Sequence, residues 1–372
     1  MKRQISIILI LLLLLGGCSL KVSEKPKEIK VGGLFALTGD GASWGIDEMQ
    51  AVQLAFDEIN TRGGINKRPV KLVIEDTQTV PRVAVTAMRK LIDVDNVQIV
   101  IGATWDESVG AIAPIVEDEK VALISPSISG ATEDEKKYDY LFTTWYSDVS
   151  SVKALLRFMA HNDHNRIAVV YNLNLWSQFF RNTLTKNAPN FGVDIVEEFA
   201  FSDDTTDFRT IIIKLKELNI DAVFFAFTSD ESMQPFIKQA RELQLSVPMY
   251  SGSQTENEKT TEWYGSYKPG VYHTYPKTGE RIEEFNRKFK DKYGREPTSP
   301  SAATAYDAAR LVIAALAEGK TTGPEIKDWL VSVKDFPGIV IPKINFDSLG
   351  LIDAGPDAFA VKTVVDDKFV EV

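Results

Sequence analysis

A regular alternation of apolar runs with amphipathic stretches constrains the fold of this chain more than any other feature. Residues 29–37 form the first apolar run, and the stretch 46–64 that follows has apolar residues at three- and four-residue steps before a Gly-Gly stop. The same cycle continues along the apolar runs 70–76, 97–102 and 121–125. Strands that alternate with amphipathic helices predict a parallel sheet with helices on both of its faces.

The alternation stops near residues 142–150 and then restarts. Four further apolar runs follow the break, at residues 166–172, 193–201, 221–227 and 248–252. Because 372 residues are enough for two domains of ordinary size, we expect an α/β protein with two lobes, each built on a parallel Rossmann-like sheet. The segment 280–345 contains two more helical patterns and must pack on one of these lobes.

The amino terminus has the layout of a secretory signal. A basic start precedes the aliphatic run 5–15, which is too short for a transmembrane helix, and two glycines lead directly into Cys18. The letters LGGC resemble a bacterial lipobox, in which the cysteine becomes the lipid-modified first residue of the mature protein. The alternative is an ordinary signal peptide with a leftover cysteine. We expect residues 1–17 to be a lipoprotein signal peptide and residues 18–28 to be a lipid-anchored tether.

Composition and motifs exclude several classes of function. The formal net charge is −10 and the sequence has no basic stripe, so we expect no nucleic-acid partner. The single cysteine rules out a disulfide within the chain and a cysteine-based metal site. The pair His161 and His164 is interpreted as a solvated helix end rather than a metal contact. Since no serine or cysteine has an evident catalytic base, we expect no catalysis, no cofactor and no metal.

Polar and aromatic residues occupy the positions where the predicted strands end. Open parallel sheets bind ligands beyond the carboxyl ends of their strands, so these positions are candidate ligand contacts. Trp105 and Asp106 follow the third apolar run in the stretch IGATWDES. A buried carboxylate is costly unless something pairs with it, so Asp106 is either a ligand contact or the N-cap of the next helix. The other candidates are Trp44, Ser127, Ser129, Trp176, Thr228 and Ser253.

Three segments carry a resemblance to a known family. Residues 33–45 read GLFALTGDGASWG, residues 59–76 read INTRGGINKRPVKLVIED, and residues 124–127 read ISPS. They resemble the type I periplasmic binding proteins of the leucine/isoleucine/valine class, which are the solute receptors of branched-chain amino acid ABC importers. The resemblance covers nearly all of the chain after residue 28. It implies two lobes that are joined by a three-strand hinge and close around a ligand.

The resemblance also implies the extent of each lobe. Residues 29–145 and 275–347 would form lobe one, and residues 146–274 and 348–372 would form lobe two. The segment with the two late helical patterns would then return to lobe one, and the last strands would lie against the hinge and lobe two.

The family's ligand contacts map onto most of the candidate positions. Trp44 matches an aromatic residue that covers the bound side chain, and Trp176 falls where a pocket tyrosine lies. Ser127 and Ser129 match the positions that hold the ligand carboxylate. Thr228 falls near a second aromatic anchor.

Two positions depart from the family pattern. Asp106 falls where the family offers a hydroxyl to the ligand carboxylate, and a carboxylate there would repel the ligand by roughly 1–4 kcal/mol. Ser253 falls where amino-acid binders place an acid for the ammonium group, and the lost charged hydrogen bond is worth about 1.5–3 kcal/mol. The departures favour a cation, an amine, an amide or a polyhydroxy ligand over leucine. Trp44, Trp105 and Trp176 near one acid suit an aromatic cage for an ammonium group, or a stacking surface for a flat ring or a sugar.

The sequence therefore predicts a lipid-anchored, extracytoplasmic solute-binding receptor. We expect it to capture a small polar, amine or amino-acid-like ligand and to deliver it to an ABC permease that is driven by ATPase subunits. The alternative is a ligand sensor of the same fold that passes its signal to a receptor or regulator. The lipobox and the lack of a fused output domain favour transport.

Overall fold

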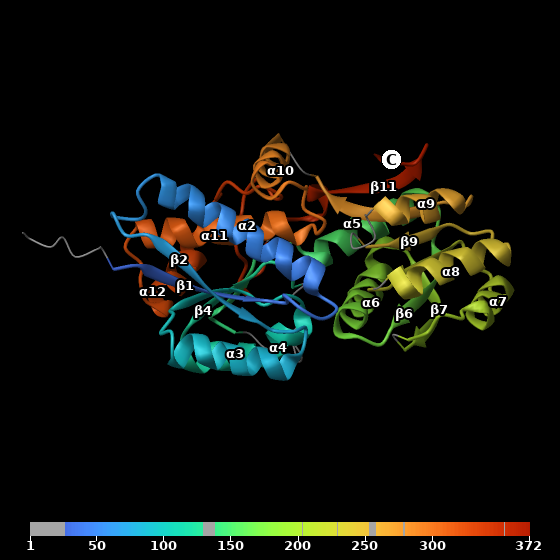
Figure 1. Ribbon diagram of the computed structural model, residues 1–372. Coiled ribbons are helices and arrows are strands. Elements are labelled where there is room, and N and C mark those ends of the chain that lie inside the picture. Colours follow the sequence, from blue (N-terminus) through green and yellow to red (C-terminus); the bar gives the residue numbers. More distant parts are fainter. Residues whose placement is uncertain are drawn as a thin grey trace, which may run out of the picture.

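The computed structural model describes residues 27–128, 138–202, 204–228, 230–252, 258–277, 280–352 and 354–372. These residues form two α/β lobes that lie side by side along the long axis of the molecule (Figure 1). None of the helices in these ranges is long and apolar enough to cross a membrane. The predicted signal peptide, Cys18 and most of the predicted tether lie outside the described residues.

Lobe one contains a five-stranded parallel sheet with the strand order β2-β1-β3-β4-β5. Its strands are β1 (Ile29–Phe35), β2 (Val70–Asp76), β3 (Ile99–Gly102), β4 (Ala122–Ser125) and β5 (Leu141–Thr143). The helices between them are α2 (Ala42–Thr61), α3 (Pro81–Asp93) and α4 (Asp106–Glu119). Side chains alternate across a strand, so Leu34 packs with α3 and α4 on one face while Phe35 packs with α2 on the other.

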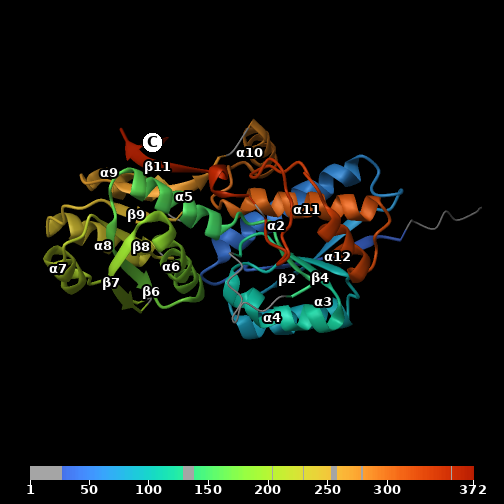
Figure 2. The same cartoon turned by 180° about the vertical axis from the view of Figure 1, so that it is seen from behind.

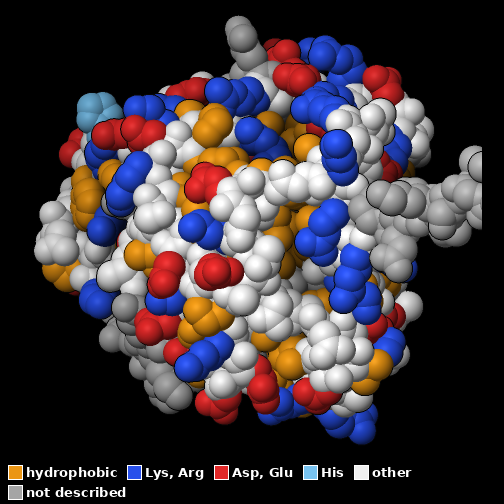
Figure 3. Space-filling model, turned by 90° about the vertical axis from the view of Figure 1, so that its left-hand side faces the viewer, with side chains coloured by type: hydrophobic (Ala, Val, Ile, Leu, Met, Phe, Trp, Pro, Cys, Tyr) orange, Lys and Arg blue, Asp and Glu red, His pale blue; other side chains and the backbone are white. Residues whose placement is uncertain are grey.

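Three helices from late in the sequence complete lobe one. They are α10 (Glu280–Tyr293), α11 (Ser301–Ala317) and α12 (Gly323–Ser332). Helix α11 packs along α2 and also contacts β3 and β4, while α12 contacts β4. Figure 2 shows these helices from behind, above the same sheet face as α2. The outer end of lobe one carries basic and acidic side chains that are interspersed, without a continuous basic stripe on this face (Figure 3).

Lobe two contains a seven-stranded sheet with the strand order β12-β11-β10-β9-β8-β6-β7. Its strands are β6 (Arg166–Asn172), β7 (Asp194–Phe201), β8 (Ala222–Ala226), β9 (Met249–Ser251), β10 (Val271–Pro276), β11 (Phe359–Val365) and β12 (Lys368–Glu371). The strands from β6 to β10 are parallel, and β11 and β12 join antiparallel at one edge. The α-helices are α5 (Asp148–His161), α6 (Leu175–Asn187), α7 (Arg209–Glu217), α8 (Asp230–Glu242) and α9 (Glu258–Ser266). The 3-10 helices η2 (Ala188–Phe191) and η4 (Pro356–Ala358) complete it. Two lobes with mostly parallel sheets confirm the predicted fold class.

The chain passes between the two sheets three times, after β5, after β10 and before β11. Hydrogen bonds join the three passages. The hydroxyl oxygens of Ser151 in α5 and Thr274 in β10 lie 2.5 Å apart, which joins the helix after the first passage to the strand before the second. The N–H of Lys277 donates to the carbonyl oxygen of Ala358 (2.8 Å), which joins the second to the third. The lobes are therefore connected through one hinge region.

Candidate functional site

The carboxyl ends of three neighbouring lobe-one strands are joined by hydrogen bonds. The N–H of Ala36, just after β1, donates to Oγ1 of Thr104, just after β3 (3.1 Å). The N–H of Trp105 donates to Oγ of Ser127, just after β4 (3.3 Å). These bonds make one continuous surface at the edge of the sheet where open parallel sheets bind ligands, and we call it the lobe-one edge.

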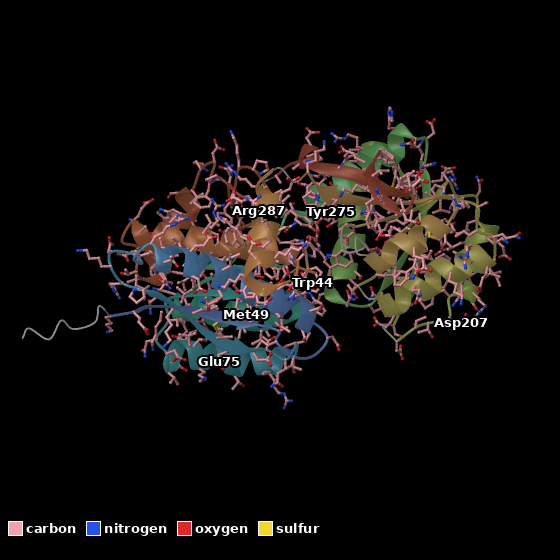
Figure 4. The ribbon with its side chains drawn as sticks, turned by 45° about the horizontal axis from the view of Figure 1, so that its top comes forward. Trp44, Met49, Glu75, Asp207, Tyr275 and Arg287 are labelled. Atoms are coloured by element: carbon pink, nitrogen blue, oxygen red, sulfur yellow. The ribbon has the colours of Figure 1, made fainter. Side chains whose placement is uncertain are left out.

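Four aromatic rings lie next to one another at the lobe-one edge, and we call Trp105, Trp44, Trp145 and Tyr146 the aromatic row. The ring centroids of Trp44 and Trp105 are 6.1 Å apart, and those of Trp44 and Trp145 are 5.7 Å apart. Trp145 stacks on Tyr146 at 4.1 Å. Figure 4 shows Trp44 at the end of lobe one that faces lobe two. The row therefore runs from the end of β3 to the first passage between the lobes.

Trp105 and Asp106 begin helix α4. Trp105 is the N-cap and has a φ of 69°, a backbone conformation that costs about 1–3 kcal/mol in a bulky residue. Asp106 is the first helical residue and is 6% exposed. The sequence left open whether Asp106 is the N-cap, and the structure gives that position to Trp105. The Asp106 carboxylate instead lies in the first turn, where the helix dipole favours an anion.

Glu48 is a fully buried acid behind the lobe-one edge. Its Oε2 accepts a hydrogen bond from the Thr104 hydroxyl (2.7 Å), while its Oε1 has no hydrogen-bond partner among the described residues. Burial raises the pKa of Glu48, and the hydroxyls of Thr104, Ser127 and Ser301 oppose that rise in pKa. Glu48 therefore joins helix α2 to the surface that carries Ser127.

Asp47, the neighbour of Glu48, is equally buried but has a different role. Its carboxylate accepts hydrogen bonds from Arg295 (2.5 Å) and from the N–H groups of Thr298 (2.6 Å) and Ser299 (2.8 Å). These bonds fix the loop before α11 against α2. Asp47 is thus a structural anchor.

The carboxyl ends of the lobe-two strands carry a network of polar side chains. The side-chain amides of Asn172, at the end of β6, and Asn174, the N-cap of α6, both donate to Oγ1 of Thr228 (3.0 and 2.8 Å). The Ser177 hydroxyl donates to Oδ1 of Asn172, and the Ser177 N–H donates to Oδ1 of Asn174 (2.9 Å). We call Asn172, Asn174, Ser177 and Thr228 the amide–hydroxyl network.

Trp176 belongs to the same end of lobe two. It is the second residue of α6, is 8% exposed, and packs on Phe180 with ring centroids 4.9 Å apart. Its indole Nε1 donates to Oδ2 of Asp148, the first residue of α5 (3.0 Å). Trp176 is therefore hydrogen-bonded to the segment that follows the first passage between the lobes.

The structure places the predicted ligand residues that it describes at two edges. The lobe-one edge holds Trp44, Trp105, Asp106 and Ser127, and the lobe-two edge holds Trp176 and Thr228. Helices α4 and α6, which begin at these edges, contact each other. The predicted contacts Ser129 and Ser253 lie outside the described residues.

Several residues of the two edges were missed in the sequence, among them Glu48, Asp148, Asn172 and Asn174. Glu48 shares the apolar face of α2 with Ala51 and Val52, and an acid at such a position was a visible signal. Asp148 and the two asparagines gave weaker signals, because acids and amides are common at helix starts and in turns. Nothing in their spacing distinguishes a site from a turn.

Other parts of the molecule fit a ligand or a metal less well. A hollow of about 200 Å³ lies between the hinge and α10, but among the predicted and aromatic-row residues only Tyr146 lines it. Within the described ranges, no group of three or more His, Cys, Asp or Glu residues could hold a metal ion. The two edges therefore remain the candidate site.

Comparisons with known proteins agree with this architecture. Residues 28–350 match the model of a family described as "Periplasmic binding protein". The Leu/Ile/Val-binding protein of Citrobacter freundii is 25% identical over 310 residues, which cover 82% of this chain and 84% of that protein. The branched-chain amino acid transporter substrate binding protein of Streptococcus pneumoniae, solved with isoleucine, has a TM-score of 0.77 at 24% identity and covers 93% of this chain and 100% of that one.

A solute binding protein of R. palustris, solved with benzoate, has a TM-score of 0.76 at 16% identity and covers 93% of this chain and 95% of that one. At these identities the solved structures establish the fold and not the ligand. Relatives of one fold thus hold ligands as different as isoleucine and benzoate.

Proposed function

Because the chain belongs to the periplasmic binding protein family, we propose that it is the lipid-anchored, extracytoplasmic receptor of an ABC importer. The resemblance predicted from the sequence is confirmed, and proteins of this family bind solutes rather than catalyse reactions. The receptor would capture a small solute between its lobes and present it to a permease and its ATPase subunits.

One observation carries this proposal. Two ligand-type surfaces, the aromatic row of lobe one and the amide–hydroxyl network of lobe two, lie at strand ends in lobes that share one hinge region. Contacts from both lobes to one ligand would favour the closed form over the open form. We take residues 29–145 with 275–347 and residues 146–274 with 348–372 as the two bodies that move.

The chemistry of the lobe-one edge supports an amine or an organic cation as the ligand. An ammonium group binds to the faces of tryptophan rings, and Trp105, which packs against Trp44, directly precedes Asp106 in the chain. Ser127, Ser129 and Ser253 would then supply hydroxyls to the polar end of the ligand.

A thermal-shift experiment tests both the receptor function and the ligand class. The probes are choline, its neutral analogue in which a carbon replaces the nitrogen, and leucine. A ligand at a hundredfold excess over its Kd adds about 2.7 kcal/mol to the free energy of unfolding. We expect choline to raise the melting temperature and the neutral analogue to have little effect. A large shift with leucine alone would retain the receptor and overturn the cationic ligand.

The substitution D106N tests the acid in the proposed site. The variant should bind a cationic ligand at least about tenfold more weakly, because a hydrogen bond or ion pair to a charged group is lost. The matched control is E107Q, which changes the half-buried neighbour in the same helical turn. Isothermal calorimetry measures the Kd. Equal Kd values for D106N and the wild type would mean that Asp106 does not contact the ligand and serves only at the start of helix α4.

The anchor is tested at Cys18. The C18A variant should leave the membrane fraction and lose incorporation of labelled palmitate, while the wild type keeps both. Uptake of the labelled ligand by cells that lack the receptor gene separates the importer from the sensor. Unchanged uptake in those cells would favour the sensor.

A further inference from the structure

Asp148 is a buried acid that contacts aromatic residues of both lobes. It follows the first passage between the lobes and is 1% exposed. Its carboxyl accepts the indole N–H of Trp176 (3.0 Å), and the side chain of Trp145 also interacts with it and lowers its pKa. Trp145 contacts Trp44 in the aromatic row, so the carboxyl links the lobe-one row to the lobe-two tryptophan.

Helix capping does not explain this carboxyl. Ser147 is the N-cap of α5, and its side chain accepts the N–H of Ser150 (3.3 Å). The carboxyl of Asp148 instead interacts with two indole groups, whose N–H can only donate a hydrogen bond. The contacts of this carboxyl with the two tryptophans are therefore separate from the start of the helix.

Within the described residues, no positive charge offsets the burial of this carboxyl. Burial raises the pKa of Asp148 to about 7, and the hydrogen bonds from Trp176 and Trp145 oppose that rise in pKa. The charged or titratable groups on the elements that pack against α5 are Tyr272, His273 and Tyr275 of β10, Arg181 and Lys186 of α6, Asp357 of η4 and Lys362 of β11. None of them is among the causes of this pKa shift, and neither are Lys153, Arg157 and His161 of α5 itself.

We infer that Asp148 is a positioning residue whose single carboxyl fixes Trp145 and Trp176, and through them the aromatic surfaces of both lobes. The inference rests on the proposed function in one respect, because that function makes Trp176 a ligand contact. A carboxylate offers two equivalent acceptors to the two indoles, whereas the protonated acid keeps one good acceptor. The paired indoles should therefore loosen as Asp148 becomes protonated.

The experiment observes the indole N–H groups directly. The full chain, purified in detergent and labelled with nitrogen-15, has six tryptophans and hence six indole signals. In a pH titration without ligand, the signals of Trp145 and Trp176 should move together with a midpoint near the pKa of Asp148, about 7. The variants W145F and W176F assign the two signals.

Three substitutions separate positioning from simple burial. In D148N both signals should stop moving. In W176F the midpoint of the Trp145 signal should rise, because that variant removes a donor that lowers the pKa. The control D307N changes a second buried acid, whose pKa burial raises to about 6, and should leave both signals unchanged. The W176F result still decides the inference if D148N does not fold.

Two results would overturn the inference. The first is that the two indole signals do not titrate together, and the second is that they titrate equally well in D148N. A titration with tetramethylammonium follows, and D148N should bind it roughly tenfold more weakly. Coupled indole signals together with no binding of any probe would retain Asp148 as a positioning residue and count against the proposed ligand class.

Discussion

The lobe-one edge and the lobe-two edge lie at equivalent places in two related α/β lobes, yet they offer different chemistry. The lobe-one edge is rich in aromatic rings, with Trp44 in contact with both Trp105 and Trp145. The lobe-two edge presents amides and hydroxyls that converge on Thr228. Ring surfaces bury large apolar area, whereas hydrogen bonds depend on direction. If a ligand binds between the two edges as proposed, we expect lobe one to supply most of the affinity and lobe two most of the orientation.

The largest expected effect is that of W44A. Trp44 is the central ring of the aromatic row, so its loss separates Trp105 from Trp145 as well as removing its own surface. Central aromatic contacts are worth about 2 kcal/mol or more, so the Kd of the best probe should rise roughly 30-fold. Isothermal calorimetry measures the Kd, with W263A of lobe two as the control for the loss of a tryptophan. A change below threefold would remove the distinction between the edges.

A smaller effect is expected for T228V, which replaces the hydroxyl with a methyl group of similar size. The amides of Asn172 and Asn174 then lose a common acceptor, and we expect roughly tenfold weaker binding. The control T61V removes an exposed hydroxyl that bonds to its own helix, far from both edges. If T228V lost more affinity than W44A, the roles of the two lobes would be reversed.

The smallest effect is expected for E48Q. Burial raises the pKa of Glu48, so the folded state binds a proton more tightly than the unfolded state does. The wild type therefore loses stability as the pH rises through that raised pKa, while the neutral glutamine does not. Near pH 5 the two proteins should differ by less than about 1 kcal/mol in the free energy of unfolding. Near pH 8 this difference should have changed in favour of E48Q.

Urea unfolding of E48Q and wild type at both pH values measures this difference. If the wild type instead became the more stable protein at high pH, Oε1 of Glu48, which has no partner among the described residues, would have to find a cation or a donor when ionised.

Much of the fold was predictable because the periodicity of strands and helices is repeated so many times. One helix in the late segment, α12, was missed even though Thr322 and Glu325 form a capping box with a proline at the helix start. A proline is tolerated in the first turn of a helix, and here it begins one.

The candidate site was only partly predictable. Strand-end residues such as Trp44 and Trp105 are found by position, because the topology brings all strand ends to one edge. Asp47 and Glu48 look alike in sequence. Only the contacts separate the anchor Asp47 from Glu48, whose Oε1 has no partner within the part of the chain that the structure describes. The role of Asp148 could not be predicted, because its hydrogen-bond partner Trp176 is 28 residues away and no local sequence pattern indicates such a partner.

Strand β1 begins at Ile29, so the chain enters lobe one at the amino end of its sheet, opposite the edge that carries the aromatic row. A lipid at Cys18 would hold the protein by that far end. The segment 18–28 can span at most about 40 Å when fully extended. The amino end of the lobe-one sheet would therefore stay within that distance of the membrane surface. Lobe two would be attached to the membrane only through lobe one. In each closing motion, lobe two would then move while lobe one stays anchored.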